Sequence, residues 1–295
     1  GGGDRGRARA AARAGSDPPW AAGGAGGRGS KMIHGLLDQI LPGLSDEEDD
    51  PSPDARYVFS PGEPAQGTPS PGTCSALIVC SPGAASGFAT GAFRLRAVPW
   101  RLELKGLERS YPPPPRPPKF FVVEGAEQAV AVALLDDQVP ADLAVAWAEA
   151  ALEAFEGASE VLFLDRLFRA EWRGLPMEEP PSEPHLCGLA TTAAFAEAAS
   201  GMRLAAAALR PLPAPNVVEG LGAALLSRLE GERKACVVAL ALQDGAHLGD
   251  GTFAAFGALG PALEALGAAP GGWRPPDYAQ VLRQVVPPAR MAIYM

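Results

Sequence analysis

Residues 212–242 read LPAPNVVEGLGAALLSRLEGERKACVVALAL, and this stretch decides the fold. It predicts a helix over Val217–Leu229, followed by an uninterrupted apolar strand over Ala235–Leu242. Asn216 could cap this helix by accepting a hydrogen bond from the backbone N–H of Glu219. The Glu219 carboxylate could in turn reach back toward Asn216, as in a capping box. A strand without polar residues must be covered on both faces, so we expect it inside a sheet with helices on each side.

The same alternation of apolar strands and amphipathic helices runs through the rest of the chain. It predicts an α/β fold, a layered sheet flanked by helices on both faces. Residues 51–73 and 170–185 are rich in Pro and in Ser, Gly or Glu, which is typical of loops. The expected strands are Ala76–Cys80, Ala92–Leu104, Lys119–Glu124 and Glu160–Phe168, and the other expected helices are Ala141–Glu156, Thr252–Leu266 and Asp277–Val286.

The composition changes at both ends of the chain. Residues 1–56 are expected to be a disordered N-terminal extension, because their Gly/Ala/Arg mixture and acidic run cannot build a core. Residues 1–31 lack a methionine, so translation could begin at Met32. Residues 57–286 are expected to form a single α/β domain, and residues 287–295 an extended tail that Pro287-Pro288 separates from the last helix.

Charge and cysteine usage restrict the partners and the compartment. Twenty-five basic and 34 acidic residues give a net charge of −9, which argues against nucleic acid as a main partner. Four scattered cysteines in 295 residues indicate reduced thiols in a reducing compartment. No apolar run approaches the ~18 residues of a membrane span, and no secretory leader is recognisable. We therefore expect a location in the cytoplasm, and in the nucleus as an alternative.

The patterns of catalytic and metal sites are incomplete. Residues 26–31 (GGRGSK) have the wrong order for a phosphate-binding loop, and residues 83–87 (GAASG) place the serine one position late for a nucleophile elbow. Among the three histidines a catalytic triad would depend on His247. His185 and Cys187 could supply two metal ligands but have no second pair at ligand spacing. Asp136-Asp137 fits a charge pair between a helix and a loop better than a catalytic dyad. We predict a protein that is not an enzyme and uses no cofactor or metal.

The chain ends in Ile293-Tyr294-Met295, a hydrophobic residue, a tyrosine and a residue with the free carboxylate. A terminal carboxylate and an aromatic ring can be captured together in a pocket that offers a lysine and backbone donors. This order at a C-terminus is that of a docking tail.

Residues 212–242 resemble the proteasome assembly chaperone 1 family in a Pro-Asn-hydrophobic-Val start to a helix, a small-residue helix face and an apolar strand. Residues 102–125 (LELKGLERSYPPPPRPPKFFVVEG) resemble the family's charged strand, tyrosine-containing turn and hydrophobic strand, with extra prolines. The Ile-Tyr-X terminus is also that of the family. The resemblance spans residues 95–295 and omits the N-terminal 90 residues and the Pro/Glu loop at 176–184.

The resemblance implies a non-enzymatic chaperone that pairs with a second, homologous assembly chaperone. The heterodimer would promote assembly of the 20S proteasome α-ring, with Ile293, Tyr294 and Met295 in a pocket between neighbouring α-subunits. The motif residues Pro215, Asn216, Val217 and Glu219 would mark the fold rather than an active site.

Two other classes of function stay open. One is an enzyme on a phosphorylase-like α/β scaffold, which a phosphate-dependent activity on nucleosides would reveal. The other is an adaptor or activator that binds mature proteasomes through the same tail.

Overall fold

The computed structural model describes residues 55–63, 66–106, 114–173, 185–196, 200–243, 250–269, 272–277 and 281. The predicted extension at 1–56 and tail at 287–295 lie almost entirely outside these residues. The described residues belong to one unit, residues 51–295.

An eight-stranded mixed sheet forms the centre of this unit, in the order β3-β5-β6-β2-β7-β10-β8-β9. The four central strands are parallel, and β5, β3 and β8 add antiparallel pairs outside them. The strands are β2 (Ala76–Cys80), β3 (Leu95–Ala97), β5 (Lys119–Val123), β6 (Val130–Leu134), β7 (Glu160–Phe168), β8 (Leu186–Ala190), β9 (Arg210–Pro211) and β10 (Ala235–Gln243).

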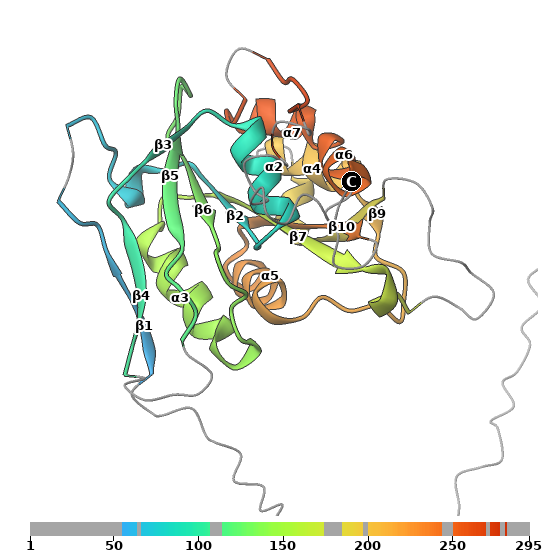
Figure 1. The fold of residues 1–295 in the computed structure, drawn as a ribbon, viewed down its shortest axis with the longest axis horizontal. Helices are drawn as coiled ribbons and strands as arrows, with labels where there is room; N and C mark the ends of the chain where they lie inside the picture. Colours follow the sequence, from blue (N-terminus) through green and yellow to red (C-terminus); the bar gives the residue numbers. More distant parts are fainter. Residues whose placement is uncertain are drawn as a thin grey trace, which may run out of the picture. The chain divides into compact units, whose positions relative to one another are not determined.

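Helices cover both faces of the sheet, which confirms the predicted fold class (Figure 1). On one face α3 (Ala144–Ala154) and α5 (Gly220–Glu232) pack against β2, β6, β7 and β10. The opposite face is covered by α2 (Ala84–Ala92), α4 (Ser200–Ala208), α6 (Asp250–Gly257) and α7 (Gly260–Ala265). Short 3-10 helices lie at Pro71–Thr73, Ala141–Leu143, Arg169–Glu171 and Thr192–Phe195.

A second, two-stranded sheet was not predicted. It pairs β1 (Arg56–Ser60) with β4 (Arg101–Lys105) in antiparallel register. Phe59 of β1 packs edge-on against Phe120 and Phe155, with ring centroids 5.8 and 5.7 Å apart. The prediction of a loop over the whole of residues 51–73 was therefore wrong at β1. These five residues lie beside Pro-rich sequence, but they pair with β4 and pack on the aromatic core.

The predicted boundaries hold best where apolar runs are continuous. The predictions for β2 and β7 match the structure, and that for β10 falls one residue short. The single strand expected over Ala92–Leu104 is wrong, because the chain leaves β3 at Val98, passes Pro99 and starts β4 at Arg101. The helix expected over Thr252–Leu266 is two helices, with Pro261 in the first turn of the second.

The C-terminal helix expected over Asp277–Val286 lies largely outside the described residues. Val281 is helical and buried, and its N–H donates to the carbonyl of Asp277 at 3.0 Å. None of the helices within the described ranges has the length and apolar character that a membrane crossing needs.

Candidate functional site

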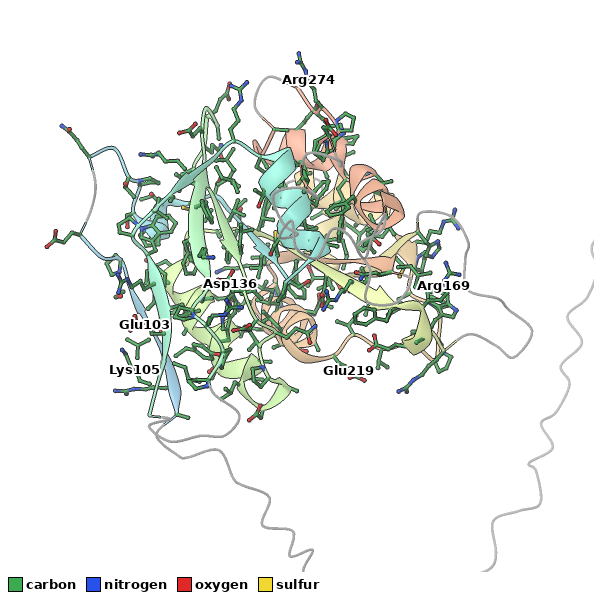
Figure 2. The ribbon with its side chains drawn as sticks, viewed as in Figure 1. Glu103, Lys105, Asp136, Arg169, Glu219 and Arg274 are labelled. Atoms are coloured by element: carbon green, nitrogen blue, oxygen red, sulfur yellow. The ribbon has the colours of Figure 1, made fainter. Side chains whose placement is uncertain are left out.

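A cleft of about 480 Å³ opens at the carboxyl ends of the central parallel strands. In an open α/β sheet this edge is where ligands usually bind. The chain leaves β2 at Ser81 and β6 at Leu135 on this edge, and the start of α5 forms the opposite wall, where Figure 2 labels Glu219. Polar, charged and apolar side chains therefore line the cleft together.

Strand register sets the floor of the cleft. Cys80 pairs with Leu164, and the Ser81 N–H donates to the Leu164 carbonyl at 2.9 Å, so Ser81 lies beside Asp165. Asp165 in turn pairs with Leu240 of β10. Alternate strand residues share a face, and Phe163 belongs to the core under α3 and α5. The Asp165 side chain therefore points to the side of the sheet where α5 begins.

Asp165 is a half-buried acid with polar and charged neighbours. Burial raises the pKa of Asp165 above its ordinary value and the Glu171 charge adds to the rise, whereas the nearby Ser81 hydroxyl and Arg166 act in the opposite direction. The Arg166 backbone N–H donates to Asp165 Oδ1 at 2.8 Å. The Arg166 guanidinium donates to the Pro82 carbonyl at 3.2 Å and lies 4.8 Å from the Phe168 ring centroid. These contacts offset only part of the free-energy cost of burying the negative charge of Asp165.

Asn216 does not cap α5, and the predicted capping was wrong. The helix begins at Gly220, and the side chain of its N-cap residue, Glu219, forms no hydrogen bond with the first turn. The Asn216 amide instead accepts from the Arg173 N–H at 2.7 Å and donates to the carbonyls of Arg173 at 3.2 Å and Pro213 at 2.8 Å. This fits the chain path, because Asn216 lies four residues before the helix, too far back to reach its first N–H groups.

The remaining motif residues surround this contact. The Ala214–Pro215 peptide is cis. Val217 is 55% exposed and lines the cleft together with Asn216 and Glu219. The motif that carried the family resemblance therefore builds one wall of the cleft.

Asp136 and Asp137 form ion pairs, as expected for a charge pair, although they follow strand β6 and not a helix. Asp137 binds the Arg116 guanidinium at 2.9 Å, and Asp136 binds Lys119 at 2.8 Å. Hydrogen bonds from the Arg116 side chain and backbone lower the pKa of Asp137 to about 2. Figure 2 labels Asp136. These contacts fix the segment before β5 to the end of β6.

The other candidates from the sequence are structural where they are described. Ser86 lies in α2 and donates to the Ser81 carbonyl at 2.8 Å. Cys187 is buried, and its thiol donates to the Leu240 carbonyl at 3.7 Å. All four cysteines are free and buried. Within the described part of the chain, no three His, Cys, Asp or Glu residues are arranged to hold a metal.

His247 and the tail residues Ile293, Tyr294 and Met295 lie outside the described residues, so their roles stay predictions. Sequence reasoning missed Ser81 and Asp165 altogether. The sequence did contain a sign of both residues. Ser81 directly follows the apolar residues of β2, and Asp165 interrupts the apolar residues of β7 near its carboxyl end.

Neither the protein-family models nor the curated proteins gave a match to the sequence. Solved structures did. PbaB of Pyrococcus furiosus, an archaeal proteasome activator, matches 81% of this chain and 97% of its own with a TM-score of 0.54 at 12% identity. This chain shares the fold of PbaB.

Two further structures match less closely. PbaA of P. furiosus, an archaeal homologue of proteasome-assembly chaperone, gives a TM-score of 0.48 at 13% identity, covering 81% of this chain and 89% of its own. A PAC2 family protein of Streptomyces avermitilis gives 0.38 at 13% identity, covering 75% and 99%. Of these three matches, that of PbaB has a TM-score above 0.5 and bears on the fold.

Proposed function

We propose that this protein is a proteasome assembly chaperone that heterodimerises with a second assembly chaperone and promotes 20S α-ring assembly. One observation carries the proposal: the fold of a proteasome activator, matched over 97% of that protein, occurs on a chain that ends in Ile293-Tyr294-Met295. Neither feature alone is specific, but the two are independent of each other. The proposal includes no catalytic step and no cofactor, and it places the protein in the cytoplasm and the nucleus.

The tail would dock in a pocket between neighbouring α-subunits. Pro287-Pro288 cannot continue a preceding helix, and the residues beyond them can reach roughly 25 Å when extended. In this arrangement the Tyr294 ring packs and fixes the chain direction, Ile293 fills an apolar recess, and the Met295 carboxylate pairs with a pocket lysine.

A single added glycine after Met295 tests the tail directly, because it moves the carboxylate without changing any side chain. Losing one partner of a buried charge pair costs about 2–5 kcal/mol, which is roughly a 30-fold to several-thousand-fold loss of affinity for α-rings. Tyr294→Ala should also weaken binding. Met291→Ala, in the same segment but outside the last three residues, is the matched control. Unchanged binding of the extended variant across a salt series would refute tail docking.

The outer faces of α3 and α5 support the pairing with a second chaperone. They form an open groove lined mostly by small side chains, together with Glu149, Arg228 and Val145, which is 58% exposed. The small side chains along the centre of such a surface let the backbone of a partner approach closely. Mixing the two purified chaperones should yield a complex with a higher midpoint of thermal unfolding than this protein alone. A stable monomer that gains nothing from the partner would contradict the pairing.

A second candidate is an adaptor or activator of mature proteasomes that uses the same tail. It is favoured by the description of PbaB as an activator. The two functions differ in the particle bound: an assembly chaperone co-purifies with precursor rings, whereas an activator co-purifies with finished 20S particles. Affinity purification from cells followed by mass spectrometry of the β-subunits separates them.

A further inference from the structure

The outer face of β1 and β4, which is turned away from the aromatic core, is positively charged. Side chains alternate between the two faces of a strand, and Phe59 and Leu102 pack into the core. Ser60 and Arg101, the residues next to them, therefore point outward, and both are exposed. The other outward residues are Arg56, Val58, Glu103 and Lys105, the last two of which are labelled in Figure 2. Three cations thus face one carboxylate, on a chain whose net charge is −9.

Arg101 has unused binding capacity on this outer face. Its side chain is 70% exposed, and its one ion pair within the described part of the chain is to Glu103 at 3.8 Å. Glu103 binds Lys105 more closely, because the Lys105 ammonium donates to its carboxylate at 2.6 Å. A guanidinium offers five N–H donors, so Arg101 can bind a further anionic group.

Ser60 lies directly across from Arg101. The two residues are partners in the antiparallel register, which places their Cβ atoms about 4.5–5.5 Å apart. The chain stays close to the opposite segment beyond this pair, because a Cβ on Gly62 would lie 2.4 Å from the Pro99 carbonyl oxygen. A group attached to the Ser60 hydroxyl would therefore lie beside the Arg101 guanidinium.

Ser60 also precedes a proline, in a segment with several such pairs. Pro follows each of Ser52, Ser60, Thr68 and Ser70. Proline favours an extended conformation for the residue before it, and proline-directed protein kinases act on Ser-Pro and Thr-Pro in extended, accessible segments. Ser60, Pro61 and Gly62 are exposed, whereas Ser81, which also precedes Pro, is 3% exposed. Ser60 thus combines an accessible Ser-Pro pair with an arginine on the opposite strand.

We propose that Ser60 is a phosphorylation site of a proline-directed kinase, and that its phosphate pairs with Arg101 and stabilises the pairing of β1 with β4. The kinase transfers the γ-phosphoryl group of ATP to Ser60. The bond between Oγ and the γ-phosphorus forms, and the bond from that phosphorus to the β,γ-bridging oxygen breaks. ADP leaves with the electron pair of the broken bond, and the hydroxyl proton passes to the catalytic base of the kinase.

The charges of the outer face favour this phosphate. A phosphoserine carries a charge of about −1.5 to −2 at pH 7 and three acceptor oxygens, which an arginine can bind through two parallel hydrogen bonds. Glu103 repels the phosphate, but it is the diagonal neighbour of Ser60 at about 7–8 Å, and Lys105 already offsets its charge. Attraction to the directly opposite Arg101 therefore prevails. The site is separate from the tail and from its docking.

Full-length protein with phosphoserine inserted at residue 60 during translation tests the pairing. Its midpoint of thermal unfolding at low salt should lie about 1–4 °C above that of the unmodified protein, and the difference should shrink as salt is added. Arg101→Gln should abolish the rise. Arg56→Gln is the matched control, because it removes the same charge from the same face four residues away from Ser60, and it should keep the rise. No rise, or a rise that survives Arg101→Gln, overturns the pairing.

Phosphorus NMR gives a second readout that a change in folding alone would not move. The phosphate signal of residue 60 should titrate at a lower pH with Arg101 present than in Arg101→Gln, because a nearby cation favours the doubly charged form. Identical titrations would contradict the contact.

Treatment of the full-length protein with a purified proline-directed kinase and Mg-ATP tests the modification itself. Mass spectrometry of its peptides should place phosphate on Ser60 and none on the buried Ser81, and Ser60→Ala should remove that phosphopeptide. Absence of phosphate from Ser60 overturns the site, whether or not the neighbouring Ser-Pro and Thr-Pro pairs are modified. The tail variants do not bear on any of these results.

Discussion

Asn216 provides the sharpest test of the structure, because two arrangements of its side chain predict opposite effects of Asn216→Asp. As a helix cap, Asp is about as good as Asn, so the variant would keep the stability of the parent. In the structure the amide donates to the carbonyls of Arg173 and Pro213. Aspartate has no N–H to donate and would place a carboxylate against two carbonyl oxygens.

The size of the effect follows from the hydrogen bonds lost. Two donor bonds at 3.2 and 2.8 Å disappear, and each is worth about 0.5–1.5 kcal/mol net. The free energy of unfolding should therefore fall by about 1–3 kcal/mol. In the Asp variant the Arg173 N–H keeps its acceptor. Asn216→Ala removes all three hydrogen bonds, so it should lower the free energy of unfolding by at least as much as the loss of the two donated bonds alone.

Urea unfolding followed by tryptophan fluorescence measures this directly, with thermal unfolding as a second readout. A loss of 1 kcal/mol corresponds to roughly 2–4 °C in the unfolding midpoint for a domain of this size. Asn216→Ser is the control, because serine is a good helix cap but is too short to reach both segments. If Asp and Ser at this position match the parent while Ala does not, Asn216 is a helix cap and the arrangement described above is refuted.

Three further predictions concern stability. Burial and the nearby Arg210 charge lower the pKa of His185 below 6.5 in the folded protein. Because the unfolded chain then binds a proton at a higher pH than the folded protein does, the free energy of unfolding should fall as the pH drops from 6.5 toward the native pKa. His185→Gln should flatten that part of a series of urea unfolding curves recorded at different pH values. Arg233 ends α5 with φ +57°, so Arg233→Gly should raise the free energy of unfolding by about 1 kcal/mol in the same assay. A Cβ on Gly157 would collide with the Gly72 carbonyl oxygen, so Gly157→Ala should destabilise by about 1–3 kcal/mol, whereas unchanged stability would contradict the close approach.

The fold class could be predicted because its central strands are continuous apolar runs. The residues of β2 and all but the last residue of β10 are apolar, and such strands are found where both sheet faces are covered. Segments of Ala and Gly gave no such signal. α2 (AASGFATGA) and β6 (VAVAL) were both missed, because alanine-rich sequence without periodicity fits a buried helix or a buried strand about equally.

The candidate site could not be predicted, because it depends on pairing between distant segments. Ser81 and Asp165 are 84 residues apart and become neighbours only through the register of β2 with β7. Likewise, Asn216 meets Arg173 from 43 residues away. Local capping rules place the Asn216 amide at the nearest helix, whereas the tertiary structure offers it two carbonyls and an N–H that bind it better than one helix N–H could.

The position of the Asn216 amide has a consequence for the cleft. Because this side chain binds the Arg173 backbone, it is not available to the first turn of α5, and Glu219 does not replace it as a cap. The segment between Pro213 and Gly220 is therefore attached to the Arg173 backbone and not to the first turn of α5 through the Asn216 side chain. The family motif and one wall of the cleft are then one feature, because two hydrogen bonds join Asn216 to Arg173, a third joins it to the Pro213 carbonyl, and all three residues or their neighbours lie at the cleft.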